Sequence, residues 1–298
     1  MKNVFGVEGV IGVPAYLAMM ILAIITGVII ILCLYKKFNF KKTQVLWLAG
    51  YVIVFGLLGA HLFSLLFRLG EVNLNSWKEF YTSVIVLFSA LMYYGGFIGG
   101  MFGAWLFSKK EDVPFLLTAD LVICALPLAH ALGRVGCFLA GCCYGMHTDS
   151  CIGVEFPYGY STGKVLPTQL FEVAFNIILF IAIIIVYFVV YRKGLTNKND
   201  KVSDSKYVGL ISIIYLIAYP IYRFIVEFFR DDNRGEILIL STSQFISIFV
   251  LAFGIYNLYK YIKRIKLIKN SEKVNIINED IKELDNKNNY KNDDNIEK

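Results

Sequence analysis

Long apolar runs with few or no charged residues dominate this chain and restrict what it can fold into. Seven runs are long enough to be membrane-spanning helices: residues 9–35, 43–67, 80–108, 113–133, 173–191, 207–229 and 237–259. A helix rises about 1.5 Å per residue, so crossing a hydrocarbon core of roughly 30 Å takes about 20 mostly apolar residues. The pattern predicts an all-α polytopic membrane protein with seven transmembrane helices in a lipid bilayer.

Composition supports the membrane assignment. Hydrophobic residues make up 57% of the chain and charged residues 17%, whereas about a quarter of a soluble domain is charged. The net charge of +6 comes mainly from lysines and arginines near the ends of the runs. Because no basic patch on a soluble face is visible, we expect no nucleic-acid partner.

The distribution of Lys and Arg predicts the orientation. Basic clusters follow the first, third, fifth and seventh runs: Lys36, Lys37, Lys41, Lys42, Lys109, Lys110, the loop 192–206 and the segment 260–269. Loops on the cytoplasmic side of a membrane carry the excess of Lys and Arg. We therefore expect the N-terminus outside and the C-terminus in the cytoplasm of a multi-pass cell-membrane protein.

The sequence divides into two parts. Residues 1–265 form the predicted seven-helix transmembrane domain. Residues 266–298 are rich in Asn, Lys and Asp, a composition too polar to bury a core. We expect a disordered cytoplasmic tail there, with a short amphipathic helix over 274–284 as the alternative.

Several ionisable residues lie within or beside the apolar runs, where charge is costly and usually serves function. Arg134 ends the fourth run, and Arg223, Glu227 and Arg230 share one helix face because they are spaced by four and three residues. If Glu227 forms an ion pair with one of these two arginines, the other arginine remains free to bind an anion. Arginines suit a lipid phosphate because a guanidinium donates two parallel hydrogen bonds. The alternative is that Arg223 and Glu227 pair to hold helices together while Arg230 reaches the interface.

Two further polar features lie close to these arginines in the sequence. His130 precedes Arg134 by four residues, so it shares that helix face and is a candidate general base near neutral pH. The segment PTQLFE, residues 167–172, puts Gln169 and Glu172 on the first turn of the fifth run.

Glycines cluster at two places. Gly133 and Gly136 flank Arg134, where small residues permit close approach of a backbone or a ligand. YYGGFIGG, residues 93–100, contains Gly95 and Gly96. Close helix packing is the simpler interpretation of this second cluster.

Four of the six cysteines fall in one outer segment: Cys137, Cys142, Cys143 and Cys151. Their pattern, C-x4-C-C-x7-C, is not a standard zinc spacing, so we expect no metal site. Small polarizable packing residues are the leading interpretation. A disulfide and a transiently modified thiol remain alternatives.

Four motifs together resemble one enzyme family. YYGGFIGG, GRVGCFLAGCCYG, LPTQLFE and YPIYRFIVEFFRDD occur in this order, as they do in the prolipoprotein diacylglyceryl transferases, which are bacterial cytoplasmic-membrane enzymes. The resemblance implies transfer of diacylglyceryl from phosphatidylglycerol to the lipobox cysteine of a prolipoprotein, the first step of lipoprotein maturation. Glycerol 1-phosphate is the leaving group, and no metal or soluble cofactor is implied.

The resemblance also implies residue roles. Arg134 looks like the signature arginine that contacts the lipid head group, and Arg223 like the second essential arginine. The residues implied to assist in substrate binding are Gly133, Gly136, Gly95, Gly96, Gln169, Glu172, Glu227, Arg230 and Gln244.

Three departures from the family pattern affect the signature loop, the base and the second run. In the signature loop, Cys137 and Ala140 replace asparagines and Cys142 replaces a glutamate. Tyr94 replaces a histidine, and His61 replaces an arginine in the second run. Tyr94 and His130 are therefore both candidates for the base. The departures keep two other functions open: a related enzyme that uses the same lipid cradle on another acceptor, and a non-catalytic redox or transport partner.

Overall fold

The protein is a bundle of long helices with two short hairpins. The computed structural model describes residues 15–68, 93–156, 163–193, 207–230, 236–237 and 240–293. The helices are α1 (Ala15–Leu34), η1 (Tyr35–Phe38), α2 (Lys42–Arg68), α4 (Tyr93–Lys110), α5 (Phe115–Leu139), α6 (Thr168–Lys193), α7 (Leu210–Val226), η4 (Glu227–Phe229) and α8 (Thr242–Asp293). Antiparallel hairpins pair β1 (Val154–Glu155) with β2 (Lys164–Val165) and β3 (Glu236–Ile237) with β4 (Leu240–Ser241).

Six of the described helices are long and apolar enough to cross a membrane: Ala15–Phe38, Lys42–Leu66, Phe115–Leu139, Thr168–Val189, Leu210–Phe229 and Thr242–Ser271. This confirms the all-α polytopic class. The expected span 80–108 lies partly outside the described residues, and α4 covers its second half. Seven spans and their orientation therefore stay predictions.

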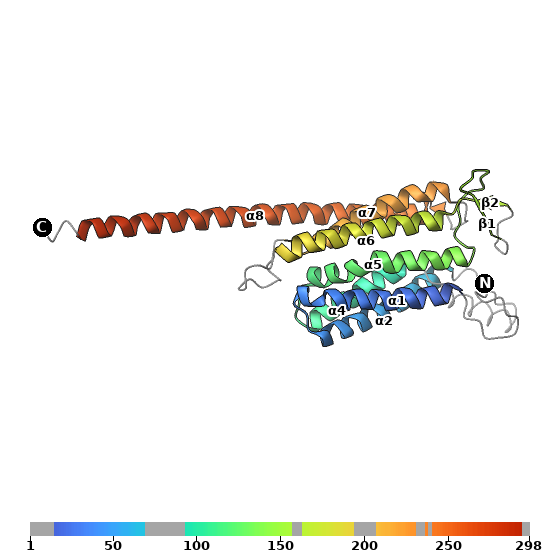
Figure 1. Cartoon of the computed structure of the whole chain (residues 1–298), viewed down its shortest axis with the longest axis horizontal. Coiled ribbons are helices and arrows are strands. Elements are labelled where there is room, and N and C mark those ends of the chain that lie inside the picture. Colours follow the sequence, from blue (N-terminus) through green and yellow to red (C-terminus); the bar gives the residue numbers. More distant parts are fainter. Residues whose placement is uncertain are drawn as a thin grey trace.

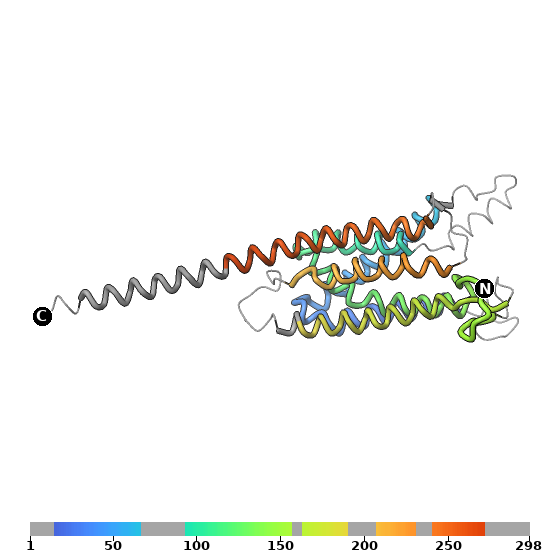
Figure 2. Tube along the Cα trace, turned by 90° about the horizontal axis from the view of Figure 1, so that it is seen from above, coloured from blue at the N-terminus to red at the C-terminus, as the bar shows by residue number. Residues whose placement is uncertain are grey.

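The helices lie side by side along the long axis of the molecule (Figure 1). α2 packs along α4, α1 along α5, α5 along α6, and α7 along α8. In Figure 2, α7 lies between α8 and α6. The end of α5, the start of α6 and the β1–β2 hairpin share one end of the bundle (Figure 1), so the candidate site residues on these elements are brought to that end.

Two boundaries differ from the expected ones. α5 continues to Leu139, so Arg134 and Cys137 are helical rather than at or beyond the end of the span. α8 is continuous to Asp293, whereas the sequence predicts a disordered tail from residue 266. The chain after Gly254 contains no glycine or proline, the residues that most readily end a helix. The division into two domains at residue 266 stays a prediction.

Glycines set the distance between α2 and α4. A Cβ added at Gly103 would lie 2.5 Å from the carbonyl oxygen of Tyr51, and one at Gly99 would lie 3.0 Å from Cα of Gly59. These separations are shorter than or at the limit of a real Cβ contact, so only glycine permits this backbone approach. The packing interpretation of YYGGFIGG is therefore confirmed.

A buried carboxylate joins α5 to the start of α7. Asp120 accepts hydrogen bonds from the backbone N–H of Gly209 at 2.7 Å, the backbone N–H of Ser212 at 2.8 Å and the Ser212 hydroxyl at 2.6 Å. A carboxylate at a helix N-terminus satisfies unpaired N–H groups and interacts favourably with the helix dipole. This contact fixes how α5 and α7, which carry the candidate arginines, lie relative to each other.

We expect Gly103→Ala to lower the thermal unfolding midpoint of the protein in detergent. Overpacking costs roughly 1–3 kcal/mol, more than the roughly 1 kcal/mol that alanine contributes through helix propensity. Gly50→Ala on α2 is the matched control, because a Cβ there meets nothing within 4 Å, and it should leave the midpoint unchanged or raise it. Equal shifts in the two variants would contradict the packing account.

Candidate functional site

Glu172 on α6 is the centre of a buried ionic cluster. Its Oε2 lies 2.7 Å from Nε of Arg134 on α5 and 3.8 Å from Nη1 of Arg230, and its Oε1 lies 3.6 Å from Nη1 of Arg223 on α7. The side chain of Glu172 is 0% exposed and that of Arg134 is 10% exposed. Three arginines, one on α5, one on α7 and one directly after the turn that follows α7, therefore meet at one carboxylate.

A second carboxylate, Glu227, completes the cluster. Its Oε2 lies 2.6 Å from Nη2 of Arg223 and 3.7 Å from Nε of Arg230, while the Ser241 hydroxyl donates to Oε1 at 2.9 Å. Among the residues that the structure describes, the cluster holds three cations and two anions. Buried charges of this kind are costly unless they are paired and hydrogen-bonded.

The sequence expectation of one helix face needs a correction. α7 ends at Val226, the turn η4 follows, and Arg230 is extended. Arg223 and Glu227 still pair at a spacing of four, and Arg230 returns to the same carboxylates through the turn. Both arginines are therefore paired with carboxylates, and neither is the cation left over that the sequence predicts.

Tyr94 on α4 reaches the cluster through serines of α8. Its hydroxyl lies 3.0 Å from Oγ of Ser247 and 3.5 Å from the carbonyl oxygen of Ser243. Nη2 of Arg223 donates to Oγ of Ser243 at 2.9 Å. Tyr94 and Arg223 therefore contact the same residue, which connects the α4 motif to the arginines.

His130 lies in an aromatic stack on the side of α5 that faces α4 and α7. Its ring centroid is 4.3 Å from that of Tyr93 and 5.2 Å from that of Tyr219. Both ring nitrogens are buried, with no hydrogen-bond partner among the described residues. An imidazole with two uncommitted nitrogens can accept a proton from a bound ligand.

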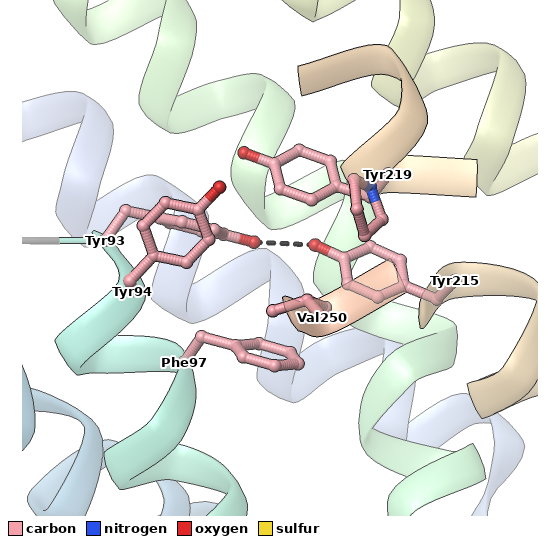
Figure 3. Close-up of a pocket in the computed structure, with 7 residues that line it drawn as sticks. Tyr93, Tyr94, Phe97, Tyr215, Tyr219 and Val250 are labelled. Atoms are coloured by element: carbon pink, nitrogen blue, oxygen red, sulfur yellow. Dashed lines mark hydrogen bonds between the residues drawn. The ribbon is translucent and has the colours of Figure 1, made fainter. Parts of the chain in front are cut away.

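A small pocket adjoins this stack. It is lined by Tyr93, Tyr94, Phe97, Tyr215, Tyr219, Pro220 and Val250. Figure 3 shows the hydroxyl groups of Tyr93 and Tyr215 pointing toward each other, and they lie 2.6 Å apart. The lining is aromatic and aliphatic apart from the tyrosine hydroxyls, so it suits the apolar part of a ligand.

The two candidate glutamines form hydrogen bonds with backbone groups beside the ionic cluster. Gln169 donates through Nε2 to the carbonyl oxygen of Cys142 at 2.7 Å. Gln244 accepts at Oε1 from the N–H of Ser241 at 3.1 Å, and its own N–H donates to the Ser241 hydroxyl at 3.2 Å. This reciprocal pair is a capping box at the start of α8, and it orients the hydroxyl that contacts Glu227.

The four candidate glycines lie at helix contacts. A Cβ at Gly136 would meet Met19 of α1 at 3.0 Å, and one at Gly133 would meet Met20 at 3.7 Å. Gly95 faces Gly59 and Phe63 of α2, and Gly96 faces Ala60 at 3.6 Å. These positions set how closely α5 and α4 approach their neighbours.

Three of the four cysteines between residues 137 and 151 converge, which the sequence did not predict. The Sγ atoms of Cys137, Cys142 and Cys143 all lie within 4.8 Å of one another, while Cys151 is exposed. Hydrogen bonding with the Cys137 thiol, followed by Cys143 and burial, raises the pKa of Cys142. As a free side chain Cys142 is thus an uncharged, weakly nucleophilic thiol, which disfavours a transiently modified cysteine at this position.

The serines of the site were also missed. Ser243 and Ser247 contact Arg223 and Tyr94, and Ser241 contacts Glu227. Their spacing of four places Ser243 and Ser247 on one helix face. Two serines at that spacing within an apolar run are the sequence feature that could have identified them.

Comparison with known proteins gives consistent matches. A family model described as prolipoprotein diacylglyceryl transferase matches residues 2–260. A Clostridium tetani phosphatidylglycerol–prolipoprotein diacylglyceryl transferase is 33% identical over 246 residues, covering 81% of this chain and 90% of that protein. Phosphatidylglycerol–prolipoprotein diacylglyceryl transferase 2 of Clostridium perfringens is 39% identical over 196 residues, covering 63% and 71%. A Finegoldia magna protein described as phosphatidylglycerol–prolipoprotein diacylglyceryl transferase is 27% identical over 273 residues, covering 91% and 98%.

We expect Glu172→Gln to destabilise the protein by roughly 3–5 kcal/mol, because it leaves three buried arginines with one carboxylate. Unfolding in detergent, followed by circular dichroism, measures the loss. Glu155→Gln, which changes an exposed carboxylate on β1, is the matched control and should have little effect. A Glu172→Gln protein as stable as wild type would show that the cluster does not hold α5, α6 and α7 together.

Proposed function

The chain belongs to the prolipoprotein diacylglyceryl transferase family, and we propose that it transfers the diacylglyceryl group of phosphatidylglycerol to the lipobox cysteine of prolipoproteins. This is the first step of bacterial lipoprotein maturation, and it releases glycerol 1-phosphate. The observation that carries the proposal is the buried cluster of three arginines and two glutamates, in a chain that the family model matches over residues 2–260.

The proposed setting is the bacterial cytoplasmic membrane. The chain crosses it seven times, with the N-terminus outside and the C-terminus in the cytoplasm. In this orientation the end of α5, the start of α6 and the end of α7 lie at the outer face, where an exported prolipoprotein presents its lipobox cysteine. Lys109 and Lys110 in the last turn of α4 support this orientation, because lysines at the ends of spans are enriched on the cytoplasmic side.

Arg134 and Arg223 bind the phosphate of phosphatidylglycerol in this proposal. Arg134 uses Nε for Glu172, and no described residue bonds its two Nη groups, which suit two phosphate oxygens. Arg223 is held by Glu227 and Ser243, so its position is fixed before the lipid arrives. Preorganised cations of this kind stabilise charge that develops in a transition state.

The reaction is a displacement at the glycerol carbon that carries the phosphate. The acceptor thiol gives up its proton, a C–S bond forms as the C–O bond breaks, and glycerol 1-phosphate leaves with the electron pair. Negative charge grows on the leaving phosphate, next to the guanidinium groups of Arg134 and Arg223. No soluble cofactor takes part.

His130 is the proposed proton acceptor. Its ring nitrogens are uncommitted and buried, and it lies one helical turn before Arg134 on the same face. Tyr94 is the second candidate, because it occupies the family position. Its hydroxyl already contacts Ser247, and a tyrosine ordinarily loses its proton only near a pKa of about 10.

The remaining candidates position these groups. Glu172, Glu227 and Arg230 hold the arginines, while Gln169 and Gln244 fix the backbone beside them. Gly95, Gly96, Gly133 and Gly136 set the approach of the helices that carry Tyr94 and Arg134.

We expect Arg134→Ala and Arg223→Ala each to reduce the transfer rate by ~10²-fold or more, because removing one preorganised donor costs about 3 kcal/mol. The measurement is complementation of a strain that lacks its own transferase, followed by mass analysis of a lipoprotein N-terminus. Lys164→Ala removes an exposed cation from β2, so it controls for loss of charge alone and should be fully active.

An unmodified lipoprotein cysteine in cells that express the wild-type chain would contradict the proposed acceptor. A lipid adduct on a different protein in those cells would instead support a related enzyme that uses the same cradle on another acceptor. Undiminished activity of both arginine variants would show that Arg134 and Arg223 do not bind the lipid phosphate.

We expect His130→Phe to lower the transfer rate by ~10²-fold or more, the usual contribution of a general base. Phenylalanine retains a ring between Tyr93 and Tyr219 but has no nitrogen. Rates with a lipobox peptide and phosphatidylglycerol in detergent measure the effect. If Tyr94→Phe is the inactive variant and His130→Phe is active, the proton acceptor is Tyr94.

A further inference from the structure

We propose that Cys137, Cys142 and Cys143 form a three-thiolate site for a soft, tetrahedral metal ion such as Zn²⁺, whose fourth position takes the thiol of the acceptor. The proposal of a metal site is based only on the positions of these three cysteines. The identity of its fourth ligand rests on the proposed function. The sequence predicts no such site, because the spacing of the cysteines is not a standard one.

The sulfur positions are close to those that a tetrahedral ion requires. A Zn–S bond of about 2.3 Å places neighbouring sulfurs about 3.8 Å apart, and the three Sγ atoms already lie within 4.8 Å of one another. A shift of about 1 Å at most brings them to bonding positions. A disulfide would use two of the sulfurs and leave the convergence of the third unexplained.

A rigid turn holds two of the three cysteines. Gly141 and Cys143 both have a φ of +65°, a left-handed conformation that is uncommon for a residue other than glycine. Thr168 donates to the carbonyl oxygen of Cys143 at 3.0 Å, and Gln169 donates to that of Cys142 at 2.7 Å. The start of α6 thus holds the turn against the end of α5, which carries Cys137, as the supporting shell of a metal site would.

The chemistry of sulfur suits such an ion. Arg134 is close enough to Cys137 and Cys143 to interact electrostatically with a metal centre that they bind. Sulfur donors select soft ions, and zinc accepts tetrahedral sulfur coordination. Three protein ligands leave a fourth position open for water or for a substrate atom, as in catalytic zinc sites.

Cys137 lies three residues after Arg134 of the proposed phosphate-binding site. His130, Arg134 and Cys137 follow one another at spacings of four and three on α5, so they share one helix face over about 10 Å. A thiol that coordinates zinc is deprotonated. A metal held here presents the acceptor as a thiolate next to the arginines that bind the leaving phosphate.

The acceptor thiol replaces water on the metal and binds as a thiolate, and its proton passes to His130 through intervening water, because His130 and Cys137 lie about 10 Å apart along α5. Its sulfur then attacks the glycerol carbon, the C–S bond forms, the C–O bond breaks, and glycerol 1-phosphate departs with the electron pair. The product is a neutral thioether and a weak ligand, so water displaces it and the three protein thiolates stay on the metal.

The first test measures metal binding by the reduced, chelator-treated full chain in detergent. We expect one Zn²⁺ per chain, and we expect Co²⁺ in its place to give thiolate-to-cobalt charge-transfer absorption. Cys137→Ser and Cys142→Ser should each weaken Zn²⁺ binding at least tenfold. Cys33→Ser and Cys151→Ser, which change exposed cysteines outside the trio, should bind as wild type does.

Two results of this test would overturn the site. One is the absence of the charge-transfer absorption in wild type, which does not depend on whether any variant folds. The other is equal Zn²⁺ binding by the trio variants and the control variants.

The second test addresses the fourth ligand. A lipobox peptide should increase the charge-transfer absorption of the Co²⁺ protein, and the same peptide with serine in place of cysteine should not. Zinc depletion should abolish diacylglyceryl transfer and zinc addition should restore it. Arg134→Ala should keep the Co²⁺ spectrum and lose transfer.

The outcomes separate the two proposals. Transfer at the same rate with and without zinc would overturn the role of the metal and leave the transferase intact. Zinc binding and a peptide-dependent spectrum without any diacylglyceryl product would support the thiol-binding metal site and contradict the transferase.

Discussion

The carboxylate of Glu172 is the contact on which the arrangement of the site depends. It is fully buried and joins arginines from α5, α7 and the segment after η4. Charged groups at membrane depth are costly unless they are paired, and Glu172 and Glu227 provide this pairing for the three arginines. A lipid phosphate is an anion that the guanidinium groups can bind in addition.

Hydrogen bonds and helix packing elsewhere in the bundle keep this cluster in place. Asp120 fixes the start of α7 against α5, and glycines allow α4 to approach α2 so closely that no Cβ fits. The capping box of Ser241 and Gln244 begins α8 where its serines meet Arg223 and Tyr94. Helix packing and capping therefore determine the geometry of the arginines.

The sequence predicted the charged part of the site because charge within an apolar run is conspicuous. Arg134, Arg223, Glu227 and Glu172 were all identified, and they meet. The role of Gln244 was missed, although a serine followed three residues later by a glutamine, as in Ser241 and Gln244, is the sequence signature of a capping box. The convergence of Cys137, Cys142 and Cys143 depends on two left-handed residues in one turn, which no spacing rule encodes. The continuation of α8 was missed because polarity outweighed the lack of helix-breaking residues.

The central claim is that the buried guanidinium group of Arg134 binds the phosphate of phosphatidylglycerol. Phosphorus NMR of phosphatidylglycerol in micelles with the purified protein tests it most directly. We predict that wild type shifts the lipid phosphorus resonance, that Lys164→Ala shifts it equally, and that a folded Arg134→Ala protein does not. An equal shift with the Arg134→Ala protein, or none with wild type, would contradict the account.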